Sequence, residues 1–139
     1  MDVKIEGLEQ LNLKIDEMFD VNELEGLVQK AALVVERDAK KKAPKRTGAL
    51  RRSIETKVEN DGNTVTATVF SPLEYAPYVE YGTGLFAETQ GRQTPWAFQD
   101  EKTGEWIWTK GQKPQPFLRP ALNENRDKIT RLIQRGLTK

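Results

Sequence analysis

The chain contains neither cysteine nor histidine in its 139 residues. Without cysteine it can form no disulfide, present no thiolate nucleophile and offer no thiolate ligand to zinc. Without histidine it lacks the commonest metal ligand and the usual general base of enzymes that work near neutral pH. Carboxylates are plentiful, but none has the paired placement that glycoside hydrolysis requires. We therefore interpret the chain as a non-enzyme and expect no catalytic, cofactor or metal site.

A long apolar run and a strong charge of one sign are also missing. No segment approaches the roughly 20 apolar residues that span a bilayer, and the polar start, Met1 to Glu6, is unlike a secretory signal. The 22 Lys and Arg nearly balance the 21 Asp and Glu, so the net charge of +1 gives no overall attraction to nucleic acid. We expect one domain over residues 1–139, made in the cytoplasm and without membrane contact.

The apolar residues that are present recur at helical spacing in three places. The first predicted helix lies within residues 6–19, the second within 23–42, and the third begins near Pro120 and ends near Gly136. The three apolar stripes consist of Leu8, Leu11, Ile15 and Met18; of Leu24, Leu27, Val28, Ala31, Val34 and Val35; and of Leu118, Leu122, Ile129, Leu132 and Ile133.

A β-hairpin is predicted before and after Asp61-Gly62, because this dipeptide favours a two-residue turn between alternating apolar strands. The pairs that this turn sets are Val58–Val65, Thr56–Ala67 and Ile54–Val69. All of these residues fall on one face, which we expect the 23–42 helix to cover. Residues 76–81 predict a third strand, which completes a small antiparallel sheet.

Residues 84–115 are an unusual region, rich in Gly, Gln and Pro, that holds all three tryptophans. Two short aromatic segments predict a second hairpin, and one register pairs Phe98 with Trp106 and Trp96 with Trp108. That register puts four rings on one face. We interpret this arm as a docking surface for a neighbouring subunit or another protein, since Trp is enriched at interface hot spots. A stacking platform for single-stranded nucleic acid and a small satellite core are the alternatives.

A basic cluster covers the C-terminal end of the 23–42 helix and the turn after it; its members are Arg37, Lys40, Lys41, Lys42, Lys45, Arg46, Arg51 and Arg52. One interpretation is structural, because cations are favoured at a helix C-terminus and lysine is common on a solvated face. The other is a contact with DNA phosphates or with an acidic protein. The residues to which the second interpretation applies are Lys40, Lys41, Lys42, Arg46, Arg51 and Arg52.

Three phrases place Pro or Gly where a helix or strand must begin or end. They are Ala43-Pro-Lys-Arg-Thr-Gly-Ala-Leu-Arg51, Tyr75-Ala-Pro-Tyr-Val-Glu-Tyr-Gly-Thr83 and Pro116-Phe-Leu-Arg-Pro-Ala-Leu122. In their order and spacing they resemble the neck or tail-completion family of long-tailed double-stranded DNA phages and prophages. The resemblance covers about residues 1–137.

The resemblance implies an α+β fold, with N-terminal and C-terminal helices packed on a small antiparallel sheet and residues 84–115 as a long loop or hairpin insertion. It also implies a virion structural protein at the head–tail junction, present in the host cytoplasm during assembly. There it forms a ring around the DNA conduit, beside head-closure or tail-tube and terminator proteins. From the basic cluster we add the hypothesis that some of its residues touch passing DNA weakly and without base specificity. The family supplies no catalytic residues. The alternative function is a small nucleic-acid-binding protein that uses the basic cluster and the Trp-rich arm.

Overall fold

The protein, described here by a computed structural model, divides into two compact units. The first unit runs to Pro72 and resumes at Phe117, and the second is Leu73–Pro116. The expected organisation as one domain over residues 1–139, with an arm at 84–115, stays a prediction. The structure describes residues 2–6, 10–14, 21–45, 48–88, 91, 94–100 and 103–137.

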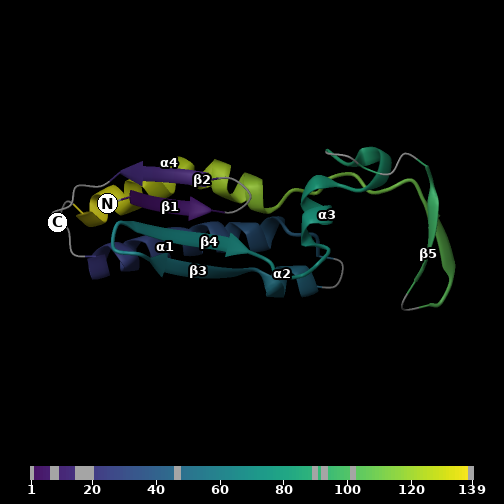
Figure 1. Ribbon diagram of the computed structural model, residues 1–139, viewed down its shortest axis with the longest axis horizontal. Coiled ribbons are helices and arrows are strands. Elements are labelled where there is room, and N and C mark those ends of the chain that lie inside the picture. The colour runs from purple at the N-terminus through teal and green to yellow at the C-terminus, as the bar shows by residue number, and fades with distance from the viewer. Residues whose placement is uncertain are drawn as a thin grey trace. The chain divides into compact units, whose positions relative to one another are not determined.

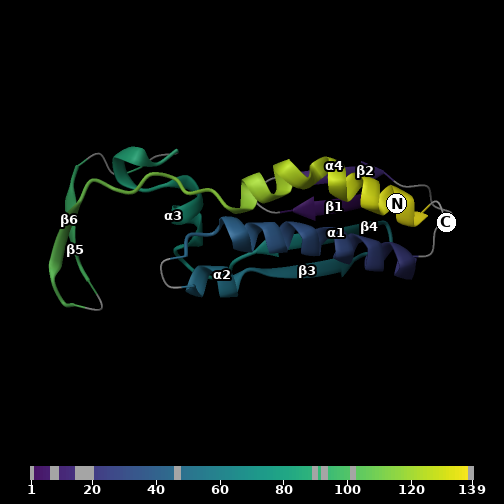
Figure 2. The same ribbon diagram turned by 180° about the vertical axis from the view of Figure 1, so that it is seen from behind.

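The first unit contains a four-stranded sheet with two long helices on one of its faces (Figures 1 and 2). β1 runs parallel to β4, and the other neighbouring strands are antiparallel. The predicted α+β class is therefore confirmed, but the sheet is mixed rather than antiparallel. The strands, in the order β2-β1-β4-β3, are β1 (Asp2–Glu6), β2 (Gln10–Lys14), β3 (Glu55–Asn60) and β4 (Thr64–Phe70); the helices are α1 (Val21–Lys42), the short α2 (Ala49–Ser53) and α4 (Leu118–Leu137).

Helix α1 is the centre of this unit, because it packs on the sheet with one part of its surface and on α4 with another. The predicted 23–42 helix and the predicted C-terminal helix are both confirmed. Gly136 does not end α4 as expected; it lies within the helix, where a Cβ would collide with the Leu27 side chain of α1. The buried side chains of α1, of strands β1 and β4, and of α4 are, in that order, Leu24, Val28, Ala31, Ala32, Val35 and Ala39; Ile5, Val65, Ala67 and Val69; and Leu118, Ala121, Leu122, Ile129 and Ile133.

The helix predicted within residues 6–19 is wrong for the residues that the structure describes. β1 and β2 form an antiparallel hairpin, in which Ile5 lies opposite Leu11 and Val3 opposite Leu13. Leu11 and Leu13 also fit the two-residue period of a strand, and a short apolar segment can satisfy both periods. Pairing with β4 decides between them, because it supplies β1 with a partner for its backbone groups. Residues 7–9 and 15–19 of that prediction lie outside the described part.

The β3–β4 hairpin has the predicted face but not the predicted register. Val58 pairs with Ala67 and Thr56 with Val69, whereas Val65 lies opposite Asn60. The register is displaced by two residues, and because side chains alternate with a period of two, each keeps its face. The apolar side chains of β4 therefore still point to α1, and the sheet packs as expected.

Local hydrogen bonds at the turn explain this displacement. Asp61 Oδ1 accepts from the backbone N–H groups of Asn63 (2.9 Å) and Thr64 (2.7 Å). These bonds, the one from Asn63 foremost, hold the pKa of the Asp61 carboxyl below its usual value. Asp61 thus flanks the turn, and Gly62-Asn63 forms its centre with Gly62 at a φ of 93°.

The second unit contains two short helices and a two-stranded ribbon. They are α3 (Ala76–Tyr81), the 3₁₀ helix η1 (Gly84–Phe86), β5 (Trp96–Gln99) and β6 (Trp106–Thr109). The strand predicted at 76–81 is wrong, because this segment is helix α3. Its buried residues, Ala76 and Glu80, are four apart as in a helix, and Pro77 occupies a first-turn position that tolerates proline.

We expect Val65→Asp to lower the free energy of unfolding by about 3–5 kcal/mol, because Val65 has no exposed surface and a carboxylate there would be buried without a partner. Thermal and urea unfolding measure the change. Thr66→Asp is the matched control, since the next residue of β4 is half-exposed on the opposite face and should change the stability by less than about 1 kcal/mol. Equal melting of Val65→Asp and the parent would contradict this packing.

Candidate interaction surfaces

Strands β5 and β6 pair one residue away from the predicted register. Trp106 lies opposite Gln99 and Trp108 opposite Ala97, while Phe98 lies opposite Ile107. Directly opposed residues share a face, so a slip of one residue moves Trp106 and Trp108 to the face opposite Phe98. The prediction of four rings on one face is therefore wrong.

The loop between the strands sets this register. Asp100 N–H donates to the carbonyl of Glu105 (2.8 Å), and Gly104 N–H donates to the carbonyl of Asp100 (2.8 Å). Gly104 adopts a φ of 74°, which a glycine takes without strain. The closing pair is thus Asp100 and Glu105, and every pair along the ribbon follows from it.

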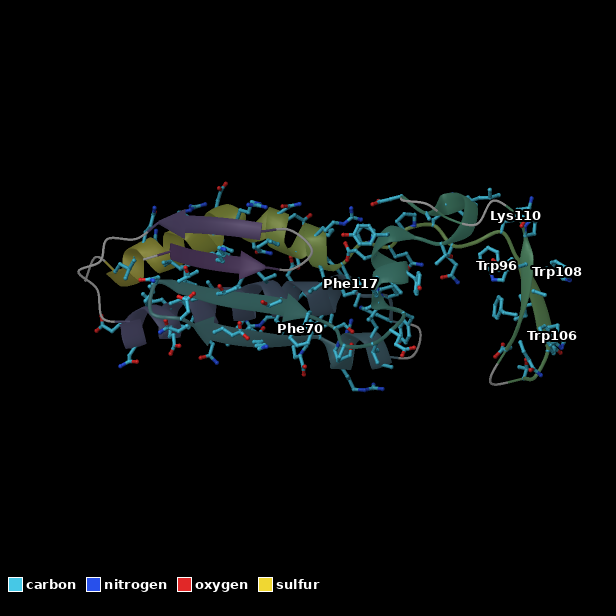
Figure 3. The ribbon with its side chains drawn as sticks, viewed as in Figure 1. Phe70, Trp96, Trp106, Trp108, Lys110 and Phe117 are labelled. Carbon is cyan, nitrogen blue, oxygen red and sulfur yellow. The ribbon has the colours of Figure 1, made fainter. Side chains whose placement is uncertain are left out.

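The two faces of the ribbon are both apolar and differ in exposure. Trp106 and Trp108 are 69% and 74% exposed on one face, and Phe98 and Ile107 are 43% and 38% exposed on the other. Trp96 shares the face of Phe98, and its ring atom Cζ3 lies 2.8 Å from where a Cβ of Gly84 would be, so its indole rests on this glycine. Figure 3 shows Trp96 and Trp108 on opposite sides of the ribbon.

The base of the ribbon is a close crossing of two backbone segments. Thr83 N–H donates to the Gln112 carbonyl and Leu85 N–H to the Lys110 carbonyl, both at 2.9 Å. A Cβ on Gly84 would collide with the Lys110 carbonyl, and a Cβ on Gly111 with the Thr83 carbonyl. Both glycines also have positive φ, so only glycine lets the segments approach this closely. The sequence carried this signal as isolated glycines, which predict close approach but not the partner.

Half of the predicted basic contact residues are engaged within the subunit. Lys42 Nζ lies 2.8 Å from Asp38 Oδ2 and 2.6 Å from Glu124 Oε2. Lys40 Nζ lies 3.7 Å from Glu36 Oε2, and Arg51 Nε donates to the Lys40 carbonyl (2.9 Å), where it satisfies a carbonyl in the last turn of α1. The structural interpretation therefore fits Lys40, Lys42 and Arg51.

The charge network around Asp38 joins α1 to α4. Burial acts to raise the pKa of Asp38, but hydrogen bonds from Lys42 and Asn125 outweigh it and hold that pKa below its usual value. The hydrogen bond to Asp38 and then that to Glu124 raise the pKa of Lys42. Asn125 Nδ2 donates to Asp38 Oδ2 (2.8 Å) and to the Ala121 carbonyl (2.7 Å). This is the electrostatic contact between the two long helices.

The other cations are free to meet a partner. Lys41 and Arg52 are exposed and make no hydrogen bond or ion pair within the described ranges. Arg37 and Lys45, which were not among the predicted contacts, are in the same condition. Arg46 lies outside the described residues. Among the described residues of the cluster, the cations that remain available for phosphate or for an acidic protein are therefore Arg37, Lys41, Lys45 and Arg52.

The described residues offer little to the other function classes. No helix among them is long and apolar enough to cross a membrane. They also contain no group of three or more Asp or Glu side chains placed to hold a metal ion.

The comparison with known families gives the decisive observation. Residues 10–82, from β2 to the residue after α3, match the model of the family described as "Bacteriophage HK97-gp10, putative tail-component". The chain belongs to this HK97-gp10-like family. The resemblance predicted from the three phrases is confirmed, and the protein is a phage structural protein. No curated protein and no solved structure matches the chain.

The family match covers only part of the chain. It includes α1, the β3–β4 hairpin, the basic cluster and α3, and it ends before the ribbon and α4. The match therefore assigns the chain to a phage tail-component family through residues 10–82. The roles of the ribbon and of the free cations have to be argued from their own geometry.

We expect Lys42→Met to lower the free energy of unfolding by about 1–2 kcal/mol, because it removes a charged hydrogen bond from the partly buried Asp38. Lys41→Met is the matched control, since it makes the same chemical change at an exposed neighbour. It should change stability by less than about 0.5 kcal/mol. Urea unfolding at neutral pH compares the two variants, and equal losses would show that Lys42 is not part of the helix contact.

Proposed function

We propose that the protein is a neck or tail-completion subunit at the head–tail junction of the virion, where copies form a ring around the DNA conduit. Membership of a phage tail-component family supports this proposal. The observation that carries it is the ribbon, on which two tryptophans are 69% and 74% exposed. Large exposed aromatic residues mark surfaces that a partner covers. The neighbouring head-closure, tail-tube or terminator proteins and adjacent copies are the partners.

A ring needs two different surfaces on each copy, because its contacts are head-to-tail and close on themselves. The edge of the sheet at β3 is one such surface, while the ribbon is left for a different protein of the junction. Asp61 N–H donates to the Thr64 carbonyl (3.2 Å), so Asp61 and Thr64 are a hydrogen-bonded pair of the antiparallel hairpin. Hydrogen-bonded and non-hydrogen-bonded pairs alternate along such a hairpin. The backbone groups of Thr56, Val58 and Asn60 therefore point away from β4. Among the described strands none pairs with β3 on that side. A strand of another protein fits there.

The free cations give the conduit its contact with DNA. Among the described members of the predicted set, Lys41 and Arg52 remain available to a phosphate, whereas Lys40, Lys42 and Arg51 are engaged within the subunit. Few free cations make weak, sequence-independent contacts, since affinity for DNA rises with the number of phosphates neutralised. Weak contact suits a conduit through which DNA slides.

A phage with a stop codon in this gene should accumulate filled heads and separate tails, because the joint between them would be missing. Electron microscopy and plaque counts of the lysate measure this outcome. The purified protein added to the lysate should restore joined, infectious particles, and the Val65→Asp variant should not. Normally joined virions in the absence of the protein would contradict the junction assignment.

The free subunit should bind double-stranded DNA very weakly at physiological salt, with a Kd no tighter than about 10⁻⁴ M, the weak end of non-specific binding. Binding at low salt should weaken further in Lys41→Glu/Arg52→Glu and persist in the control Lys40→Gln/Lys42→Gln, whose cations are already paired. Fluorescence anisotropy over a salt series measures both. Tight, sequence-specific binding would instead favour a nucleic-acid-binding protein.

A further inference from the structure

The ribbon exposes apolar side chains on both of its faces. A tryptophan side chain contributes about 150–250 Å², so Trp106 and Trp108 together expose on the order of 300 Å². Phe98 and Ile107 add on the order of 150 Å² on the opposite face. A partner that lay against one face would therefore leave the other face in water.

A stable protein interface buries about 800 Å² on each partner. One face of a ribbon with four residues in each strand supplies less than half of that area. Both faces together with the polar edges come closer to it. A two-stranded ribbon alone is also only marginally stable in water, and a partner that covers both faces stabilises the pairing itself.

The chemistry of the ribbon selects a protein as that partner. The strand sequences Trp96-Ala-Phe-Gln99 and Trp106-Ile-Trp-Thr109 contain no charged residue, although 31% of the chain is charged. Depletion of charge with enrichment of aromatic residues is typical of the centre of protein interfaces. Nucleic acid is disfavoured, since its affinity depends mainly on cations that neutralise phosphates.

We propose that the ribbon inserts as a wedge into an uncharged, apolar slot of a different virion protein, which covers the Trp106/Trp108 face and the Phe98/Ile107 face at once. The proposal rests on the proposed function, in that the slot belongs to a neighbour at the head–tail junction. The crossing at Gly84 and Gly111 holds the base of the wedge, because backbone hydrogen bonds join the two segments there. Trp96 rests on Gly84 and belongs to this base rather than to the slot contact.

The first test uses the lysate of the stop-codon phage and the purified full-length protein. Trp106→Ser/Trp108→Ser and Phe98→Ser/Ile107→Ser should each lower the yield of joined particles at least about tenfold, as loss of interface hot spots does. Asp127→Ser/Lys128→Ser is the matched control, because it replaces two exposed side chains of α4 that belong to neither proposed surface. It should join heads to tails like the parent. Normal joining by either ribbon variant would overturn the slot.

The second test needs no variant and so does not depend on how a variant folds. Hydroxyl-radical labelling of the wild-type protein, free and in joined particles, reports the exposure of each of the four side chains. All four should become several-fold less reactive in the particle. Protection of one face only, or of neither, would overturn the slot. The presence of the protein in joined particles would still support its place at the head–tail junction. The mass of the free protein in solution should be the same for the parent and the ribbon variants. A lower mass for the variants would show that the ribbon joins two copies of this chain, and it would overturn the choice of a different protein as the partner.

Discussion

The burial of the apolar stripe of α1 is the contact on which the rest of the main unit depends. This helix packs on the sheet through β3 and β4 and on α4 through a second set of side chains. Val28, Ala31, Ala32, Val35 and Ala39 have at most 1% of their surface exposed. Alanine at three of these positions lets the sheet and α4 approach the helix closely. Because the sheet and α4 both pack on α1, they hold this helix in place, and with it the basic cluster at its C-terminal end.

The packing of α1 against α4 determines which cations of the basic cluster are already paired within the subunit. Asp38 of α1 lies within reach of Lys42 and of Asn125 on α4, so Lys42 serves the contact between the helices. Arg51 satisfies a carbonyl in the last turn of α1. Lys41 and Arg52 are neighbours of these residues in sequence, yet they are exposed and make no hydrogen bond or ion pair within the described part of the chain. Adjacent cations in one cluster thus have different roles, and only the helix-to-helix geometry separates them.

The ribbon follows a different principle from the main unit. Its register depends on a loop of hydrogen bonds between Asp100, Gly104 and Glu105 and not on burial of one apolar face. Its base depends on two glycines that allow backbone segments to touch. Local backbone geometry can therefore place large aromatic side chains in water, a surface that packing alone would bury. Such a surface supports the proposal that a neighbouring protein covers the ribbon.

The sequence by itself determined the long helices, the α+β class, the face of the β3–β4 hairpin and the phage family, since periodicity and the order of Pro and Gly are local signals. It failed where two local solutions compete. Leu11 and Leu13 fit a strand as well as a helix, and Ala76 and Glu80 are buried at helical spacing within a segment that also alternates like a strand. Only the tertiary structure decided these cases, because the pairing of β1 with β4 and the packing around α3 involve residues distant in sequence. It likewise decided that Trp106 and Trp108 face away from Phe98, since a one-residue difference in register leaves the composition unchanged but exchanges the faces.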